Sequence, residues 1–158
     1  MQSFTLDAID RRILRILQRD SLIANQDLAQ EVGLSPPACL KRVRRLRSTG
    51  AIRRTVSILS PDALGYPLTT VIRVKLALPI VEAAKSFEAA MAEQPRVFQC
   101  MMVAGDFDYI LLVRSRDVGD YQAFARGVLA VTPGIQSYAS EIVLTVTKDT
   151  TEIPVDDR

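Results

Sequence analysis

The sequence predicts an α+β fold in two parts: three helices, then a domain whose elements run strand, helix, strand, strand, helix, strand. Apolar residues recur at helical spacing in the first part and alternate over several stretches of the second, as in half-buried strands. Charge divides the chain similarly, because the first 63 residues hold 11 basic and 6 acidic side chains and the remainder holds 9 and 12. We therefore expect a helical domain at 1–58, a linker at 59–67 and a second domain at 68–158.

Three helices are expected in the first part. Apolar residues at helical spacing predict a helix over 6–19 and a shorter one over 25–32, which ends at Gly33 because glycine suits a left-handed C-cap. Ser35, whose side chain is expected to accept hydrogen bonds from the first-turn amides, and the proline after it favour the start of a third helix, which runs to about residue 48. A glycine-containing turn between the second and third helices is typical of a helix-turn-helix.

The segment after the third helix is expected to be a strand. Ile52, Val56 and Ile58 are separated mainly by polar residues, and Arg53 and Arg54 stand near its start. Such a strand would act as a wing beside the helices. The first part is therefore expected to be a winged helix-turn-helix.

The second part has the element order of a ferredoxin-like βαββαβ domain. The patterns predict strands and helices at 71–78, 80–91, 97–103, 109–114, 121–129 and 138–146. Helices cover only one face of such a sheet, and two of its strands are apolar on both faces. A bare apolar sheet face predicts an oligomer.

The composition argues against several classes of protein. The chain has no histidine, so neither serine–histidine nor cysteine–histidine catalysis is available within it. Cys39 and Cys100 are far apart in the sequence, which argues against a zinc site and against a disulfide framework. No uncharged run approaches the roughly 20 residues that span a bilayer. We expect a cytoplasmic protein that is not an enzyme and has no metal, no cofactor and no membrane contact.

The third helix carries the clearest functional pattern. Residues 32–61 contain no acidic side chain and seven basic ones, an arrangement that favours a polyanionic partner. A recognition helix in the DNA major groove needs short residues at its start and basic residues one and two turns later. The residues expected to contact DNA are Ser35, Pro37, Ala38, Lys41, Arg42, Arg45, Arg53 and Arg54. The alternative is an ordinary solvated basic helix.

A second pattern lies in the turn at 104–109, where Gly105 precedes two aspartates, Asp106 and Asp108. These carboxylates can hold the ammonium group of a free amino acid, while backbone amides hold its carboxylate. A structural turn with solvated aspartates explains the same residues.

Two blocks of residues resemble one known family. The first comprises Leu6-Asp7, Gly33-Leu34-Ser35-Pro36 and Gly50; the second comprises 104–109 and Pro133-Gly134. Together they are similar to the Lrp/AsnC (feast/famine) transcriptional regulators, in the same order and over nearly the whole chain. The resemblance implies a regulator of amino-acid metabolism genes that responds to an amino-acid effector. It also implies a homodimer, commonly assembled into an octamer as a tetramer of dimers, and a palindromic double-stranded DNA operator follows from two-fold symmetry.

The resemblance places the effector between dimers, beside the 104–109 turn. The residues it implies for the ligand site are Met102, Val103, Gly105, Asp106, Asp108, Ser140, Ile142 and Val143. Since four of these side chains are apolar, an aliphatic or sulfur-containing amino acid is favoured over a charged one.

The sequence also departs from the family pattern. Asn25 follows an alanine where the family often has a serine cap, so Asn25 is expected to cap the second helix. Lys41 stands where an acidic residue is frequent, which favours a stronger phosphate contact. Two other classes share the second domain: decarboxylases of haem biosynthesis and stand-alone sensing proteins. The absence of histidine argues against the enzyme, and the helix-turn-helix argues against the stand-alone sensor.

Overall fold

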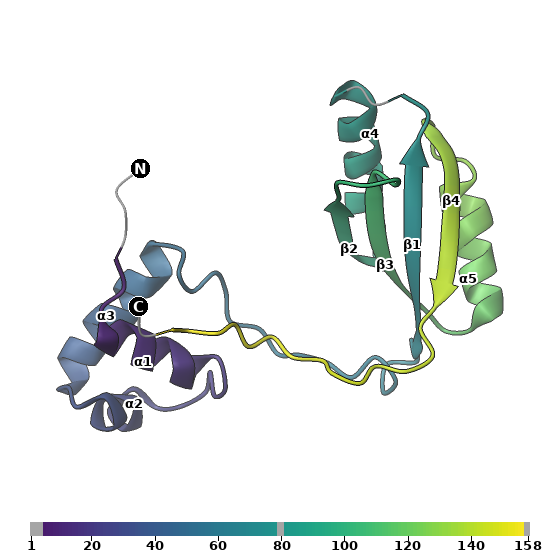
Figure 1. The fold of residues 1–158 in the computed structure, drawn as a ribbon. Helices are drawn as coiled ribbons and strands as arrows, with labels where there is room; N and C mark the ends of the chain where they lie inside the picture. The colour runs from purple at the N-terminus through teal and green to yellow at the C-terminus, as the bar shows by residue number, and fades with distance from the viewer. Residues whose placement is uncertain (1–4, 79–80, 157–158) are drawn as a thin grey trace. The chain divides into compact units, whose positions relative to one another are not determined.

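The computed structural model describes residues 5–78 and 81–156 (Figure 1). The chain forms two compact units, one of Met1–Ser57 with Lys148–Arg158 and one of Ile58–Thr147. The C-terminal segment therefore belongs with the helices, and its expected place in the domain at 68–158 is corrected. Each unit is described by itself below.

The helical unit contains the three expected helices, α1 (Ala8–Leu17), α2 (Asn25–Val32) and α3 (Pro36–Ser48). Asp7 caps α1 in a capping box, in which its side chain and that of Asp10 accept each other's backbone N–H. Gly33 ends α2 with φ 72°, the left-handed conformation that its sequence position predicted. Ile13, Cys39 and Leu46 are fully buried where the helices meet.

Three local expectations in this unit are wrong. Asn25 does not cap α2; Ala24 holds the cap position, and Asn25 Nδ2 donates to the Pro36 carbonyl at 2.9 Å. The Ser35 side chain makes no capping hydrogen bond; of the two backbone positions that usually donate to a cap, residue 37 is a proline without an N–H. The expected wing strand at 52–58 is not formed, since no described segment of the chain pairs with it.

The C-terminal segment lies along α1. Arg15 donates from Nε and Nη2 to the Val155 carbonyl at 3.0 and 2.7 Å. Gln18 exchanges two hydrogen bonds with the Ile153 backbone, at 3.2 and 3.0 Å. Because the segment is held largely through its backbone, no apolar pattern in the sequence predicts this contact.

The sheet unit has the predicted ferredoxin-like order. Its elements are β1 (Leu68–Leu76), α4 (Val81–Ala92), β2 (Val97–Met102), β3 (Tyr109–Ser115), α5 (Val118–Phe124), the π-helix η1 (Ala125–Leu129) and β4 (Ile135–Ile142). The strands lie in the order β2-β3-β1-β4, and each pair is antiparallel. β4 lies earlier in the chain than expected, so Leu144 and Val146 fall outside the sheet.

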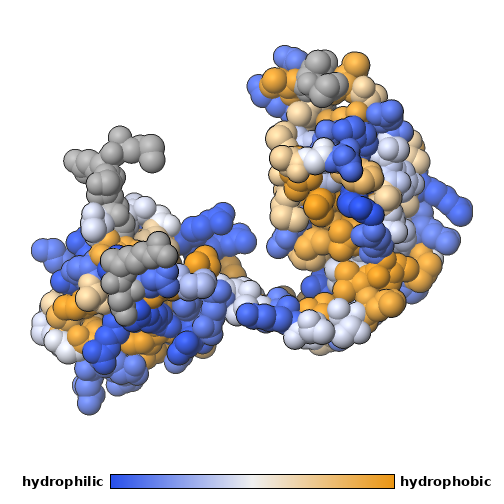
Figure 2. All heavy atoms as spheres, viewed as in Figure 1, coloured by the Kyte–Doolittle hydropathy of each residue, from blue (hydrophilic) through white to orange (hydrophobic). Residues whose placement is uncertain are grey.

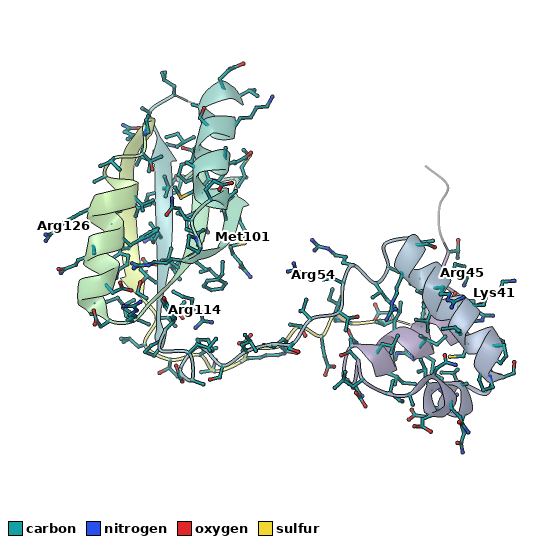
Figure 3. All side chains as sticks on the ribbon, turned by 180° about the vertical axis from the view of Figure 1, so that it is seen from behind. Lys41, Arg45, Arg54, Met101, Arg114 and Arg126 are labelled. Atoms are coloured by element: carbon teal, nitrogen blue, oxygen red, sulfur yellow. The ribbon has the colours of Figure 1, made fainter. Side chains whose placement is uncertain are left out.

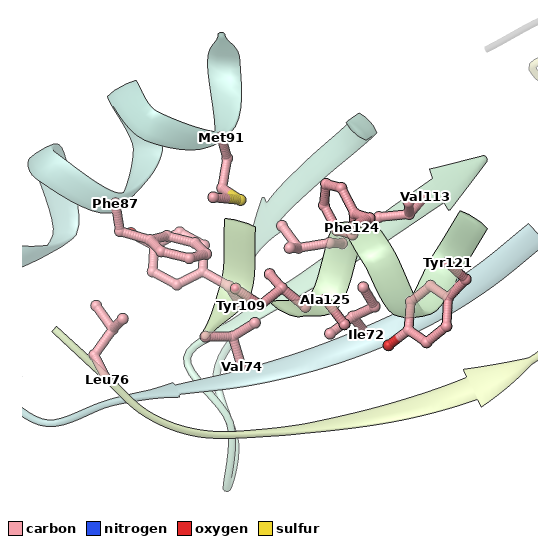
Figure 4. Packing of buried hydrophobic residues seen from close by; sticks show 12 residues of the cluster. Ile72, Val74, Leu76, Phe87, Met91, Tyr109, Val113, Tyr121, Phe124 and Ala125 are labelled. Carbon is pink, nitrogen blue, oxygen red and sulfur yellow. The ribbon is translucent and has the colours of Figure 1, made fainter. Parts of the chain in front are cut away.

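Helices α4 and α5 cover the same face of this sheet (Figure 4). The rings of Phe87 from α4 and Tyr109 from β3 pack with their centroids 4.7 Å apart. Met91 and Phe124 complete the contact from the two helices. The Tyr109 hydroxyl donates to Glu88 at 2.7 Å, so the one polar group of this aromatic pair is satisfied.

The opposite face of the sheet carries both apolar and charged side chains (Figure 2). The half-buried positions of β1 and β3 alternate with the buried ones and therefore point to this face. The side chains on it include Val71, Arg73 and Lys75 of β1, Ile110, Leu112 and Arg114 of β3, and Phe98 and Met101 of β2. Arg73 lies 5.0 Å from the Phe107 ring and Arg114 lies 4.9 Å from the Phe98 ring. No helix within the described residues has the length and apolar character needed to cross a bilayer.

Candidate DNA-binding and effector sites

Helix α3 buries one side and exposes the other. Cys39, Val43 and Leu46 pack into the core of the helical unit. On the opposite side Pro37, Lys41, Arg44 and Ser48 are exposed, at spacings that bring them into one row along the helix. We call these four residues the exposed row. Two of its members, Pro37 and Lys41, were predicted to contact DNA, and Arg44 was missed.

Two of the predicted DNA contacts, Arg42 and Arg45, instead point to α1. Asp10 of α1 is fully buried, and its carboxylate accepts hydrogen bonds from Arg42 Nη1 at 3.0 Å and from Arg45 Nη2. Arg42 also donates to Asp7. The hydrogen bond from Arg42 holds the pKa of the Asp7 carboxyl below its usual value and raises the pKa of Arg42. These pairs join α1 to α3.

The magnitudes favour keeping these pairs when DNA binds. Removing one partner from a buried ion pair costs about 3–5 kcal/mol, because the other charge is left uncompensated. A good base contact contributes about 1–3 kcal/mol. Releasing both arginines from the buried Asp10 would therefore cost more than either recovers from a base. Their geometry supports a positioning role, and Lys41 and Arg44 remain as the long basic side chains of the exposed row.

Arg53 and Arg54 lie close to the C-terminal end of α3. Gly50, at φ 80°, reverses the chain after the helix, and the Ile52 amide donates to the Leu46 carbonyl at 3.0 Å. The reversal forms a hollow of about 330 Å³ lined by Arg47, Ile52, Arg53, Arg54 and Thr55. Figure 3 shows Lys41 and Arg45 on α3 and Arg54 on the segment that follows it. Arg47 was missed by the sequence analysis.

The turn between β2 and β3 is held to β1 by Asp108. One carboxylate oxygen accepts from the Leu76 amide at 2.7 Å, and the other lies 3.4 Å from Lys75 Nζ. The Asp108 amide also donates to the Val74 carbonyl at 2.9 Å. Asp106, by contrast, is exposed and has no hydrogen bond or ion pair with the rest of the described chain. Of the two aspartates, Asp106 is the one whose carboxylate is available to a ligand.

The eight residues implied for the ligand site separate into two groups. Met102, Val103, Gly105, Asp106 and Asp108 surround the turn beside Leu76, at one end of β1. Ser140 and Ile142 pair with Ile72 and Thr70, and the Val143 amide donates to Thr69. Leu76 and Thr70 are six residues apart on one strand, about 20 Å. One chain therefore does not bring both groups into a single pocket.

Ser140 has a different partner in the sheet unit. Its side chain is on the helical side of β4, where it accepts a hydrogen bond from the Tyr121 hydroxyl of α5. This contact gives Ser140 a structural role within one chain.

The fold and these surfaces define a class of protein: a DNA-binding regulator that joins a helix-turn-helix to a ligand-binding sheet domain. An AsnC-type helix-turn-helix domain matches residues 6–47, and an Lrp/AsnC ligand binding domain matches residues 69–153. The chain belongs to the Lrp/AsnC family. It is a transcriptional regulator and not an enzyme.

Proteins of similar sequence and structure match almost the full length of this chain. The leucine-responsive regulatory protein of Haemophilus influenzae is 37% identical, over 92% of this chain and 87% of that protein. The leucine-responsive regulatory protein of Escherichia coli K12 is 33% identical, over 97% of this chain and 93% of that protein. A Neisseria meningitidis transcriptional regulator, solved as a complex with L-Met, has a TM-score of 0.91 and 32% identity, over 96% of this chain and 98% of that one. An AsnC family regulator of Agrobacterium tumefaciens has a TM-score of 0.89 and 36% identity, over 94% and 97%.

Proposed function

We propose that this regulator reads double-stranded DNA with the exposed row of α3 and responds to an amino acid held beside the β2–β3 turn. The DNA-binding part of the proposal rests on the different surroundings of the basic residues of α3. Arg42 and Arg45 are bound to the buried Asp10, whereas Lys41 and Arg44 are exposed and have no partner in the described chain. Ser35, Pro37 and Ala38, near the helix start, are small enough for a close approach to base edges.

The DNA experiment compares two double charge removals. Replacement of Lys41 and Arg44 by alanine should weaken binding to a duplex selected by the wild-type protein from a random library by at least about 30-fold, since two base contacts of about 1–3 kcal/mol each total at least about 2 kcal/mol. Replacement of Lys85 and Arg126, which are exposed on helices of the sheet unit, removes the same charge (Figure 3). Fluorescence anisotropy measures both. Equal affinities for the two double variants would contradict the assignment of the exposed row.

The effector half of the proposal depends on Asp106. The free carboxylate of Asp106 suits the ammonium group of an amino acid, and the side chains of Met102 and Val103 nearby are apolar. If the site is enclosed between dimers, an unpaired charge on the ligand side chain would be costly, so we propose an aliphatic or sulfur-containing amino acid. The Neisseria relative, solved with L-Met, supports this choice. The genes under control are proposed to serve amino-acid metabolism.

Calorimetric titration with L-Met and L-Leu tests this site. Replacing Asp106 by asparagine should weaken binding by at least about 10-fold without lowering thermal stability, because removing a charged hydrogen bond costs about 1.5–3 kcal/mol. Asp108→Asn should lower thermal stability as well, because Asp108 holds the turn to β1. Asp62→Asn, at an exposed aspartate far in sequence from the turn, is the control. Unchanged affinity in Asp106→Asn, or no binding of either amino acid, would remove the turn as the effector site.

Assembly is the last part of the proposal. The sheet face opposite α4 and α5, here called the open face, carries Ile110, Leu112 and Val71. No element of the described chain covers it, which favours a homodimer through this face. Dimers assembled further into an octamer would provide the interfaces in which the effector turn lies. A two-fold dimer favours a palindromic operator. Because its DNA target is there, we propose a cytoplasmic location.

A further inference from the structure

The hollow at the end of α3 is built by the chain reversal at Gly50. The hydrogen bond from Ile52 to Leu46 folds the following segment back onto the helix, and Ile52 packs against the core of the helical unit. This places Arg53 and Arg54 around the same hollow as Arg47. The arrangement is therefore fixed by the fold of the helical unit itself.

The charge of this hollow is unbalanced. Its lining includes three guanidinium groups and no carboxylate. None of the three guanidinium groups makes a hydrogen bond or ion pair with another described residue, and all three arginines are exposed. A basic residue near the C-terminus of a helix stabilises the helix dipole, which accounts for Arg47. It does not account for Arg53 and Arg54, which lie beyond the helix.

The chemistry of the lining suits a phosphate group. Guanidinium groups offer paired N–H donors that match phosphate oxygens, and the Thr55 hydroxyl adds a further donor. Lys41, Arg44 and Arg47 follow one another at three-residue spacing on α3, so the basic surface continues from the exposed row to the hollow. A DNA strand lying beside α3 would present its backbone to these groups.

We propose that the hollow formed by Arg47, Arg53 and Arg54 is a binding site for phosphodiester groups of the DNA backbone. The site holds the duplex without reading its sequence, while the exposed row supplies the base contacts. This inference rests on the proposed DNA binding by α3. It assigns separate energetic signatures to the two surfaces, since phosphate contacts determine the salt dependence and base contacts determine selectivity.

The test is the salt dependence of duplex binding by the full chain. Removing one phosphate-binding side chain should reduce the slope of log K against log salt by about 0.9. The triple variant Arg47→Ala, Arg53→Ala, Arg54→Ala should therefore reduce the slope by about two to three on both selected and random duplexes. Its ratio of affinities for the two duplexes should stay within about 3-fold of wild type, because phosphate binding carries no sequence information. The Lys85→Ala, Arg126→Ala variant should keep the wild-type slope.

Further variants keep the test decisive. The triple lysine variant retains the charge and should retain the slope. If the triple alanine variant does not fold, Arg53→Ala and Arg54→Ala, both outside α3, should each reduce the slope by about 0.9. An unchanged slope, or a selectivity ratio that falls to one, would overturn the phosphate site while leaving DNA binding by α3 intact. A wild-type protein that binds no duplex would overturn both.

Inorganic phosphate at millimolar concentration is the last probe: tighter binding of free phosphate than of a duplex would assign the hollow to a small phosphorylated ligand and overturn the backbone site.

Discussion

Replacing both Arg42 and Arg45 by methionine is expected to destabilise the helical unit by about 3–5 kcal/mol. Methionine retains most of the apolar stem of each arginine, so the main change is the removal of charge. The double variant leaves the carboxylate of Asp10 fully buried with neither of its arginine partners. Hydrogen exchange of the α1 and α3 amides, measured in the full chain, reports the stability of this unit separately from the sheet unit.

A third substitution separates the cost of a buried charge from that of the missing hydrogen bonds. Adding Asp10→Asn to the methionine background removes the buried charge and should recover part of the stability, although Asp10→Asn alone weakens the wild-type unit. The capping hydrogen bond from the backbone amide of residue 10 to Asp7 remains available in every variant. A triple variant less stable than the methionine double variant would show that the ion pairs are not what makes the double variant unstable.

This network also explains where the prediction of the DNA-binding residues failed. The sequence shows a run of basic residues on α3 but not which side of the helix each occupies relative to α1. Asp10 offered a signal, because it lies three residues before the fully buried Ile13 and so shares its face of α1. A carboxylate at a core position requires a cation from a neighbouring element. Arg42 and Arg45 were the available cations.

The parts of the fold that were predicted well depend on local chemistry. Gly33 fixed the end of α2, and the alternation around Val74 and Leu111 fixed the sheet and its helical cover. The parts that were missed depend on partners distant in sequence. Val155 meets Arg15 through a carbonyl group that every residue possesses, and the alternation at 52–58 predicts a strand without showing whether another strand pairs with it.

The same limit applies to the ligand site. Apolar residues at 142 and 143 and the acidic turn were assigned to one site because a family pattern linked them. The register between β1 and β4 places Ile142 opposite Thr70, whereas Asp108 contacts Leu76 at the other end of β1. The register of an antiparallel pair depends on the whole sheet, so it could not be obtained from either segment alone.

Replacing Leu112 by glutamate is expected to raise the dissociation constant of the proposed dimer by at least about 100-fold, or about 2.7 kcal/mol. Leu112 lies on the open face of β3, a central strand, and pairs directly with Val71 of β1. In a two-fold interface each substitution occurs twice, so two carboxylates would be buried against the apolar side chains of the interface. Like charges brought together in an interface cost several kcal/mol.

The matched control is Val131→Glu, which introduces the same charge at an exposed apolar residue outside the sheet. Sedimentation velocity at micromolar concentration should find a dimer or larger assembly for wild type and for Val131→Glu, and a smaller species for Leu112→Glu. Since Leu112 points away from the face covered by α4 and α5, the sheet unit itself should remain folded, as circular dichroism can check. A wild-type monomer, or an assembly that Leu112→Glu leaves unchanged, would mean that copies of this chain do not associate through the open face, and the Arg73–Glu141 pair beside Val71 would then be an ordinary surface contact.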